Sequence, residues 1–489
     1  MARPSDQEVH AILERVRRRF GQPSTARLPA AEAPTAARER PRGAAESVAP
    51  GVFTSVDAAV GAAERAYESY REQGLESRYG VISAVREAMR RDAEELGRLA
   101  AEETGLGRAD DKHVKNLLVT NKTPGPEDLE PLAKTGDAGM TVTEYAPFGV
   151  VGAITPTTNP VATIINNTIA VVSAGNSLVF NVHPNAKKVS VETIRRLNAA
   201  ITAAGGPANL VAGVAEPTIE SAQELMHHRE VRLLVVTGGP AVVREAMKSD
   251  KRAICAGPGN PPVLVDETAD VDLAAREIVR GASFDNNMVC TDEKEVFVVA
   301  SQGDELLRAF GRAGAVVLKE YELRKLERVI FERLGEPGRP GVINRRWIGQ
   351  DAGKILAEIG SPVDGDLRLI VADVPQEHSL VWTEQMMPVM PVARVRDADE
   401  GIDLAVRAEH GFRHTASIFS NDVATITKMA RAMRVSIFVA NAANVAGLGE
   451  GGEDFTSFSI ATPTGEGLTR PRSFSRIRRL TVVGSLRIV

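Results

Sequence analysis

The chain has 489 residues, of which 43% are hydrophobic, and is long enough for two or more domains with sizeable cores. Its net charge of -5 at pH 7 provides no general attraction to nucleic acid or to an anionic membrane. Two cysteines are too few for a disulfide framework, which fits a reducing compartment. The sequence has no apolar stretch of the roughly 18 residues that span a bilayer and no signal-peptide pattern. We therefore expect a cytoplasmic enzyme that acts on small molecules.

Residues 5–20 predict an amphipathic helix that begins near Ser5. One face carries the apolar side chains at helical spacing, namely Val9, Ile12, Leu13, Val16 and Phe20. Residues 21–50 are rich in Ala, Pro, Arg and Glu without periodicity, which favours a flexible linker. A short helix gains stability by burying its apolar face in a partner's groove, so we interpret 5–20 as a docking segment. Folding back on its own domain and binding a membrane surface are the alternatives.

From Val52 to about Arg108 the pattern is helical, and beyond it predicted strands alternate with predicted helices. The strands fall at 150–154, 177–181, 210–211 and 233–237, and the helices at 160–174, 186–204 and 220–228. This alternation predicts right-handed crossovers and a parallel sheet covered on both faces. We therefore predict a dinucleotide-binding domain over residues 51–256, interrupted near 137–146 by an arm strand.

The second half repeats the alternation less regularly, with strands near 263–265, 295–299 and 369–371. It predicts a second α/β domain over residues 257–450. The segment 451–489 ends in "RIRRLTVVGSLRIV", a strand without an obvious partner nearby. Because an open strand edge invites pairing with another subunit, we expect a homo-oligomer, either a dimer or a tetramer. No His, Cys and carboxylate set has metal-ligand spacing, so no metal site is expected.

Cys290 stands just before a predicted strand, where a loop can present it as a nucleophile. Taken alone, a cysteine is more often a small buried hydrophobe, and Cys255 is interpreted in that way. The surroundings of Cys290 favour the nucleophile, because seven blocks occur in one order. They are "TEYAPFGVVGAITPTTNP", "AGNSLVFNVHPNAKK", "VVTGGPAVVREA", "AGPGNPPVLVDETADV", "FDNNMVCTDEKEVFVV", "TEQMMPVMPV" and "DFTSFSIATPTGEGLTRPRSF".

These blocks resemble the aldehyde dehydrogenase superfamily, and more closely the CoA-acylating propionaldehyde and acetaldehyde dehydrogenases of bacterial microcompartments. The similarity runs from about residue 52 to the C-terminus. It implies an α/β fold with a Rossmann-like parallel-sheet cofactor domain, an α/β catalytic domain and a small β oligomerisation arm. It also implies oxidation of a short-chain aldehyde, propionaldehyde or acetaldehyde, to an acyl-CoA, with NAD as cofactor and coenzyme A as co-substrate.

In that family, an N-terminal helix and linker like those at residues 5–50 direct the enzyme into a protein-shelled microcompartment. The resemblance therefore implies that residues 5–20 bind shell proteins. It places the enzyme in the lumen of the compartment, within the cytoplasm.

The resemblance implies roles for two catalytic residues. Cys290 matches the nucleophile whose thiolate adds to the aldehyde and later carries the acyl group as a thioester. Asn159 matches the asparagine whose side-chain amide, with the backbone N–H of the nucleophile, forms the oxyanion hole. Capping of a helix that starts at Pro160 is the other role open to Asn159.

The resemblance also implies a cofactor site. Glu384 matches the glutamate that binds the nicotinamide ribose, and Thr237, Gly238 and Gly239 match a turn into a helix N-terminus near the pyrophosphate. Thr155, Pro156, Asn181 and His183 stand in the matching blocks and are assigned to the same cofactor. Asn181 replaces the lysine of hydrolytic relatives, which leaves the choice between NAD and NADP open.

Ala256 stands where hydrolytic relatives carry a glutamate that activates water. Without a general base at that position, we expect slow hydrolysis of the thioester and transfer to a thiol. Glu384 could serve as the base instead, so a hydrolytic aldehyde dehydrogenase is the alternative enzyme. A non-catalytic, shell-associated scaffold is the alternative outside enzymes.

Overall fold

The computed structural model describes residues 47–488, which all belong to one compact unit. The helix predicted at 5–20 and the linker predicted at 21–50, except for its last four residues, lie outside the described residues. Within the described range, no helix is both long enough and apolar enough to cross a membrane.

Within residues 47–488, a first sheet of seven strands has the order β1-β2-β7-β6-β5-β8-β9. All neighbours are parallel except β1, which pairs antiparallel with β2. The strands are β1 (Ser47–Ala49), β2 (Val52–Phe53), β5 (Val150–Ile154), β6 (Ser177–Asn181), β7 (Val211–Val214), β8 (Val231–Thr237) and β9 (Arg252–Ala256). The strands predicted at 150–154 and 177–181 are confirmed to the residue. Both are buried along their whole length, as a sheet covered on both faces requires.

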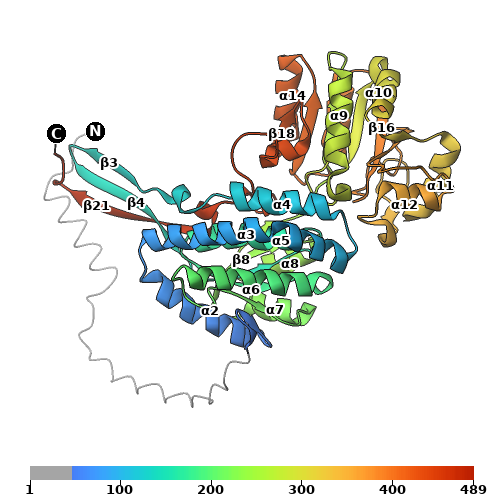
Figure 1. The fold of residues 1–489 in the computed structure, drawn as a ribbon. Coiled ribbons are helices and arrows are strands. Elements are labelled where there is room, and N and C mark those ends of the chain that lie inside the picture. Colours follow the sequence, from blue (N-terminus) through green and yellow to red (C-terminus); the bar gives the residue numbers. More distant parts are fainter. Residues whose placement is uncertain (1–46, 489) are drawn as a thin grey trace, which may run out of the picture. The chain divides into compact units, whose positions relative to one another are not determined.

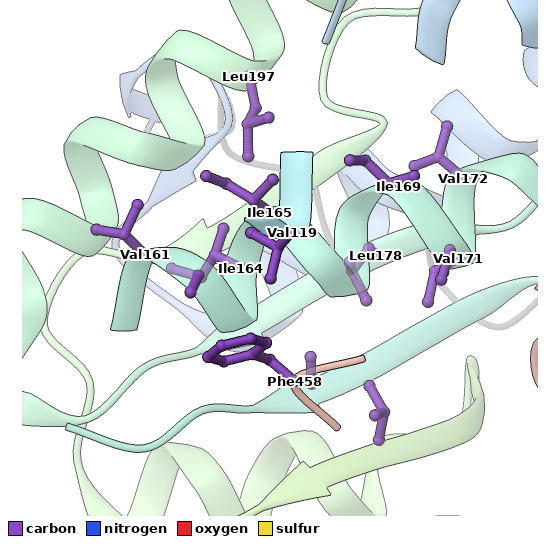
Figure 2. Close-up of a cluster of buried hydrophobic side chains, with 14 of the residues drawn as sticks. Val119, Val161, Ile164, Ile165, Ile169, Val171, Val172, Leu178, Leu197 and Phe458 are labelled. Atoms are coloured by element: carbon purple, nitrogen blue, oxygen red, sulfur yellow. The ribbon is translucent and has the colours of Figure 1, made fainter. Parts of the chain in front are cut away.

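The helices of this half are α2 (Val56–Arg71), α3 (Leu75–Thr104), α4 (Ala109–Lys122), α5 (Pro160–Ser173), α6 (Lys187–Ala203), α7 (Ile219–His227) and α8 (Pro240–Met247). Every residue of α5 is buried, because this helix packs against α3, α4 and α6 as well as against β6. Figure 2 shows Ile164 and Ile165 of α5 in the same apolar cluster as Val119 of α4 and Leu197 of α6. A helix that is apolar all round is stable only when it is buried in this way, and α5 therefore holds its first residues firmly.

The order of the first sheet reverses beside β5. The chain runs from β5 through β6 to β7 on one side, and α7 then leads it to β8 on the other side of β5. In open α/β sheets, ligands bind beyond the carboxyl ends of the strands at such a point. Here those ends are followed by Thr155 and by Gly238.

The second sheet of the described chain also has seven strands, all parallel, in the order β12-β15-β16-β11-β10-β17-β18. The strands are β10 (Pro262–Val265), β11 (Glu295–Val299), β12 (Val316–Val317), β15 (Ile370–Val374), β16 (Val389–Val395), β17 (Thr415–Phe419) and β18 (Ile437–Ala440). The helices are α9 (Val271–Ala282), α10 (Ala300–Arg312), α11 (Glu320–Ile330), α12 (Ala352–Glu358), α13 (Ala398–Ala408) and α14 (Val423–Met433). This half also contains the short hairpin of β13 (Phe331–Arg333) and β14 (Val342–Ile343), whereas the hairpin of β19 (Ile460–Ala461) and β20 (Gly467–Leu468) contacts β9 of the first sheet.

A separate antiparallel sheet forms an arm, seen in Figure 1 as β3, β4 and β21 running side by side. The strands are β3 (Leu132–Gly136), β4 (Gly139–Pro147) and β21 (Ser475–Val483). The C-terminal strand, which has no partner nearby in the sequence, forms the arm with the strand predicted near 137–146. It pairs with β4 along its whole length, with Ser475 opposite Pro147 and Val483 opposite Gly139. Sequence pattern could not show this, because the two strands are far apart along the chain.

Residues 47–49 were expected to belong to the linker, and the structure instead places them in β1. The turn that returns the chain to β2 contains Gly51, whose φ of +76° favours glycine. A Cβ atom at this position would also lie 2.1 Å from Nδ2 of Asn198. Three residues are too few to show a strand pattern, so only the turn could have predicted this pairing.

Candidate active site

A cavity of about 170 Å³ lies at the reversal point of the first sheet. It is lined by residues that follow β5, β8 and β9 and by residues that precede β11 and β16. Of the predicted site residues, the structure brings together Pro156, Asn159, Thr237, Gly238, Gly239, Cys290 and Glu384. Thr155, Asn181 and His183 do not line this cavity.

The loop that presents Cys290 begins with three consecutive residues in the left-handed region. The φ angles of Asp285, Asn286 and Asn287 are 46°, 56° and 65°. Asp and Asn tolerate this conformation better than other residues with a Cβ atom. The amide of Asn287 donates to the carbonyl oxygens of Ala282 and Glu293, at 2.8 and 2.9 Å. These bonds hold the approach to Cys290 in one shape.

Lys294 lies under the same loop and is fully buried. Its Nζ is 3.3 Å from each of three carbonyl oxygens, those of Asn287, Val289 and Asp292. Sequence reasoning missed this residue, because "TDEKE" reads as a run of solvated charges. The structure places its ammonium group under the loop that carries Cys290.

The thiol of Cys290 is held protonated at neutral pH. Burial raises its pKa, the nearby carboxylate of Glu384 raises it further, and the charge of Lys294 opposes both, so that the pKa rises to about 12. Cys255 is fully buried in β9 and does not line the cavity, and burial raises its pKa to about 11. Of the two thiols, only Cys290 reaches the cavity.

Asn159 occupies the N-cap position of α5, but its side chain makes no capping hydrogen bond. The amide is used elsewhere. Its Oδ1 accepts from Nζ of Lys115 at 2.6 Å, and its Nδ2 donates to Oγ1 of Thr158 at 3.2 Å. The capping role is therefore limited to the backbone of Asn159, and the side chain turns to Lys115 and the cavity.

Glu384 is the carboxylate among the residues that line the cavity. Its Oε1 accepts from the backbone N–H of Gly259 at 3.4 Å, and burial raises its pKa. Ala256 ends β9 opposite Thr237 and also lines the cavity. At the position of Ala256 the wall thus carries a methyl group and no base.

In the turn from β8 into α8, the N–H of Gly238 donates to the carbonyl oxygen of Ala256 at 3.2 Å, and Gly239 is the N-cap before Pro240. A Cβ atom on Gly239 would meet nothing within 4 Å, so the space in front of the helix N-terminus is open. The aligned peptide dipoles of α8 favour a phosphate at this end. Nearby, the hydroxyl of Thr155 is buried without a hydrogen-bond partner in the described structure. These features suit the pyrophosphate of a dinucleotide.

Asn181 and His183 lie at the end of β6, the neighbouring strand. The Oδ1 of Asn181 accepts from Oγ of Ser221 at 2.5 Å, and its Nδ2 donates to the carbonyl oxygen of Thr218 at 3.3 Å. The Nδ1 of His183 accepts from the backbone N–H of Asn185 at 3.2 Å. The amide of Asn181 is thus bound to the start of α7.

Comparison with known proteins supports the geometry. The family model described as the aldehyde dehydrogenase family matches residues 45–317 and 368–454. The acetylating acetaldehyde dehydrogenase EutE of Salmonella typhimurium is 51% identical over 443 residues, which cover 90% of this chain and 94% of that protein.

Two solved structures are also similar. One is a propionaldehyde dehydrogenase of Rhodopseudomonas palustris with bound CoA and an acylated cysteine, with a TM-score of 0.87, 44% identity and coverage of 90% of this chain and 99% of that chain. The other is a propionaldehyde dehydrogenase from the fucose utilisation bacterial microcompartment of Clostridium phytofermentans, with a TM-score of 0.87, 41% identity and coverage of 90% and 100%. The fold, the cavity with its cysteine and these similarities agree, and the chain belongs to the aldehyde dehydrogenase family.

Proposed function

We propose that the chain is a CoA-acylating aldehyde dehydrogenase that oxidises propionaldehyde or acetaldehyde with NAD through a thioester on Cys290. The observation that carries this proposal is a single cavity that holds Cys290 and Asn159, with Ala256 at the end of β9. The bound CoA and acylated cysteine of the Rhodopseudomonas palustris protein support the same chemistry.

In the first step, Sγ of Cys290 adds to the carbonyl carbon of the aldehyde, and negative charge develops on the carbonyl oxygen. Nδ2 of Asn159 and the backbone N–H of Cys290 donate to this oxygen, which stabilises the tetrahedral thiohemiacetal. The thiol must lose its proton first, and Glu384 is the carboxylate of the cavity that can accept it. Its raised pKa brings it closer to that task.

Bound NAD would supply a nicotinamide ring that accepts the hydride. Thr237, Gly238 and Gly239 would hold the pyrophosphate at the start of α8, and Glu384 would hold the ribose. Thr155 and Pro156 would complete this wall. Asn181 and His183 belong to the adenosine side, where Asn181 would have to exchange its bond to Ser221 for one to the cofactor.

After the hydride leaves, the acyl group remains on Cys290 as a thioester. The sulfur of CoA attacks the thioester carbon, the bond between that carbon and Sγ of Cys290 breaks, and the proton of the CoA thiol passes to Sγ, which gives acyl-CoA and the free thiol of Cys290. Glu384, which took the proton of Cys290 in the first step, is then a neutral acid, and the methyl group of Ala256 cannot activate water, so transfer to the thiol of CoA is favoured over hydrolysis.

The test is an assay of the purified enzyme with NAD⁺ and propionaldehyde or acetaldehyde, with and without CoA. We expect acyl-CoA by mass spectrometry and sustained reduction of NAD⁺ only when CoA is added. Free acid formed at the same rate without CoA would identify a hydrolytic enzyme, and no turnover in either case would favour a scaffold. Cys290→Ser should abolish turnover, while Cys255→Ser should retain it.

We further infer a homo-oligomer formed through the arm. In the described chain, the outer edge of β21 has no partner strand. Ile477, Leu480 and Val483 of this strand are 67%, 64% and 77% exposed. An exposed strand edge with apolar side chains favours pairing with a second copy. Light scattering of wild type and of Ile477→Lys/Leu480→Lys should show a smaller particle for the variant.

We also propose that residues 1–20 direct the enzyme to the lumen of a microcompartment by binding shell proteins, and that residues 21–46 link them to the enzyme, whose first strand is β1. In this scheme residues 51–256 bind the cofactor, 257–450 carry out catalysis, and 451–489 supply the oligomerisation strand. The microcompartment origin of the Clostridium phytofermentans relative supports the location. Deletion of residues 1–20 should retain activity and abolish co-purification with shells. Unchanged association with shells would contradict the proposal.

A further inference from the structure

Lys115 is a buried lysine of α4 that is 1% exposed. Its Nζ donates to Oδ1 of Asn159 at 2.6 Å and also to Oδ2 of Asp285. An ammonium group removed from water needs such acceptors, because an unpaired buried charge is strongly destabilising. Lys115 therefore joins the asparagine that begins α5 to the loop that carries Cys290.

Asp285 anchors this arrangement from the other side. Its carboxylate also accepts from Nζ of Lys112 at 2.9 Å and from the backbone N–H of Arg108 at 2.7 Å. Burial alone would raise the pKa of Asp285, but Lys112 and Lys115 together lower it. The carboxylate is thus ionised, and it fixes where the ammonium of Lys115 lies.

The charge of Lys115 determines which end of the Asn159 amide faces it. An ammonium group has three donors and no acceptor, so the amide must turn its oxygen to Lys115 and its nitrogen away. Nδ2 then has one hydrogen for Thr158 and a second for the cavity. A rotated amide would instead present its oxygen to the reacting carbonyl oxygen, and two acceptors would face each other.

We propose that Lys115 is a positioning residue that holds the amide of Asn159 with its nitrogen toward the reacting carbonyl oxygen. The proposal rests on the proposed function, in which Asn159 donates to that oxygen. The proposal adds a requirement on the position of the Lys115 ammonium group, and this requirement is the same whichever aldehyde is the substrate. The ammonium must stay on the far side of the amide throughout the reaction.

Lys112 provides a matched control on the same helix. It is 3% exposed and donates to the same Oδ2 of Asp285, while Lys115 is the lysine of the two that bonds Asn159. Removing either lysine leaves Asp285 with one ammonium, so both variants keep a one-to-one ion pair. Lys115→Met and Lys112→Met therefore differ in the support of Asn159.

The experiment measures kcat and KM for acyl-CoA formation in wild type, Lys115→Met, Lys112→Met, Asn159→Ala and Lys115→Met/Asn159→Ala. We expect Lys115→Met to lower kcat about 10- to 100-fold with little change in KM, because the donor is misaligned rather than removed. Lys112→Met should stay within about threefold of wild type. The double variant should match Asn159→Ala, since a residue that acts through another adds no further loss.

Equal losses in Lys115→Met and Lys112→Met, or a double variant whose loss is the product of the two single losses, would overturn the proposal. Lys115→Gln keeps a hydrogen-bond donor, so its kcat should be higher than that of Lys115→Met. Equal losses of kcat in these two variants would also contradict the proposal. Melting temperatures and the rate of Cys290 alkylation should match between the two Met variants if both fold alike. If wild type makes no acyl-CoA, it is the proposed function that fails.

Discussion

Nζ of Lys294 donates to the carbonyl oxygen of Val289, the residue before Cys290, at 3.3 Å. The same ammonium also binds the carbonyl oxygens of Asn287 and Asp292. One ammonium group thus binds three carbonyl oxygens of the loop around Cys290 and opposes the rise in the pKa of the Cys290 thiol. The conformation of this loop and the reactivity of the Cys290 thiol therefore both depend on the side chain of Lys294.

Replacing Lys294 by Met should therefore lower stability and thiol reactivity together. Three buried carbonyl groups would lose a donor at about 1 kcal/mol or more each, so the free energy of unfolding should fall by about 3 kcal/mol. Alkylation of Cys290 at pH 9 should also slow, because the pKa of the thiol rises further.

Glu295→Gln is the control for Lys294→Met. Burial raises the pKa of Glu295 well above its ordinary value, and neither of its oxygens has a partner in the described structure. Gln keeps the size of Glu295 and breaks none of the hydrogen bonds that Lys294 makes in the described structure, so it should change stability and alkylation less than Lys294→Met does. An equal effect of both substitutions would contradict a specific role for the cation.

The pKa of Cys290 near 12 predicts the pH dependence of its alkylation by iodoacetamide. Only the thiolate reacts, so the rate should rise about tenfold per pH unit from pH 7 to pH 10 without a plateau. Mass spectrometry of the labelled peptide distinguishes Cys290 from Cys255. A plateau below pH 8 in the enzyme without substrates would show that the thiol is activated before anything binds.

In the proposed reaction, the residue at position 256 determines whether water competes with CoA for the thioester. Ala256→Glu places a carboxylate at the end of β9 in the cavity wall, and hydrolysis of the acyl-enzyme should rise about 100-fold or more. Ala256→Gln has the same size without a base and should not produce this gain. Free acid formed in the absence of CoA is the measurement. Equal hydrolysis in the Glu and Gln variants would mean that space, and not a base, limits the attack of water.

His414 predicts loss of stability in acid. Burial, and secondly the charge of Lys294, lower its pKa from 6.5 to about 3. Between these values the unfolded chain binds a proton that the folded chain does not. The stabilisation is therefore present above about pH 6.5 and is lost as the pH falls toward 3. His414→Asn should reduce the slope of unfolding free energy against pH by up to about 1.4 kcal/mol per unit between pH 6 and 4. Equal slopes in urea titrations of the two proteins would contradict this.

The sequence predicted the parts of the fold whose signal is local. The strands at 150–154 and 177–181 are apolar throughout because both faces are covered, and their bounds were predicted to the residue. β16 was not predicted. It contains Pro391, which cannot donate to a sheet, yet it lies between β15 and β11. The arm of β4 and β21 was expected from the family resemblance, but its register was not, because it depends on residues far apart in the chain.

For the candidate site too, the sequence predicted some residues and missed those whose role depends on distant parts of the chain. Resemblance predicted Cys290, Asn159 and Glu384, and the structure places all three in one cavity. Lys115 and Lys294 were missed, since the charged stretches "DDKHVKN" and "TDEKE" resemble a solvated surface, and the role of Asp285 was missed because its partner Lys115 is 170 positions away. All three side chains are buried, and only the packed structure reveals their partners.

The register of the arm has a consequence for biosynthesis. Thr141 of β4 lies opposite Thr481 of β21, with their hydroxyl oxygens 3.0 Å apart and 340 positions between them in the chain. At a translation rate of about 5 to 20 residues per second, the ribosome needs roughly 20 to 70 s to cover that interval. During this time one side of β4 is open to any nascent neighbour on the same polysome. Chaperones that shield exposed strands would protect the β3–β4 hairpin until the late segment emerges.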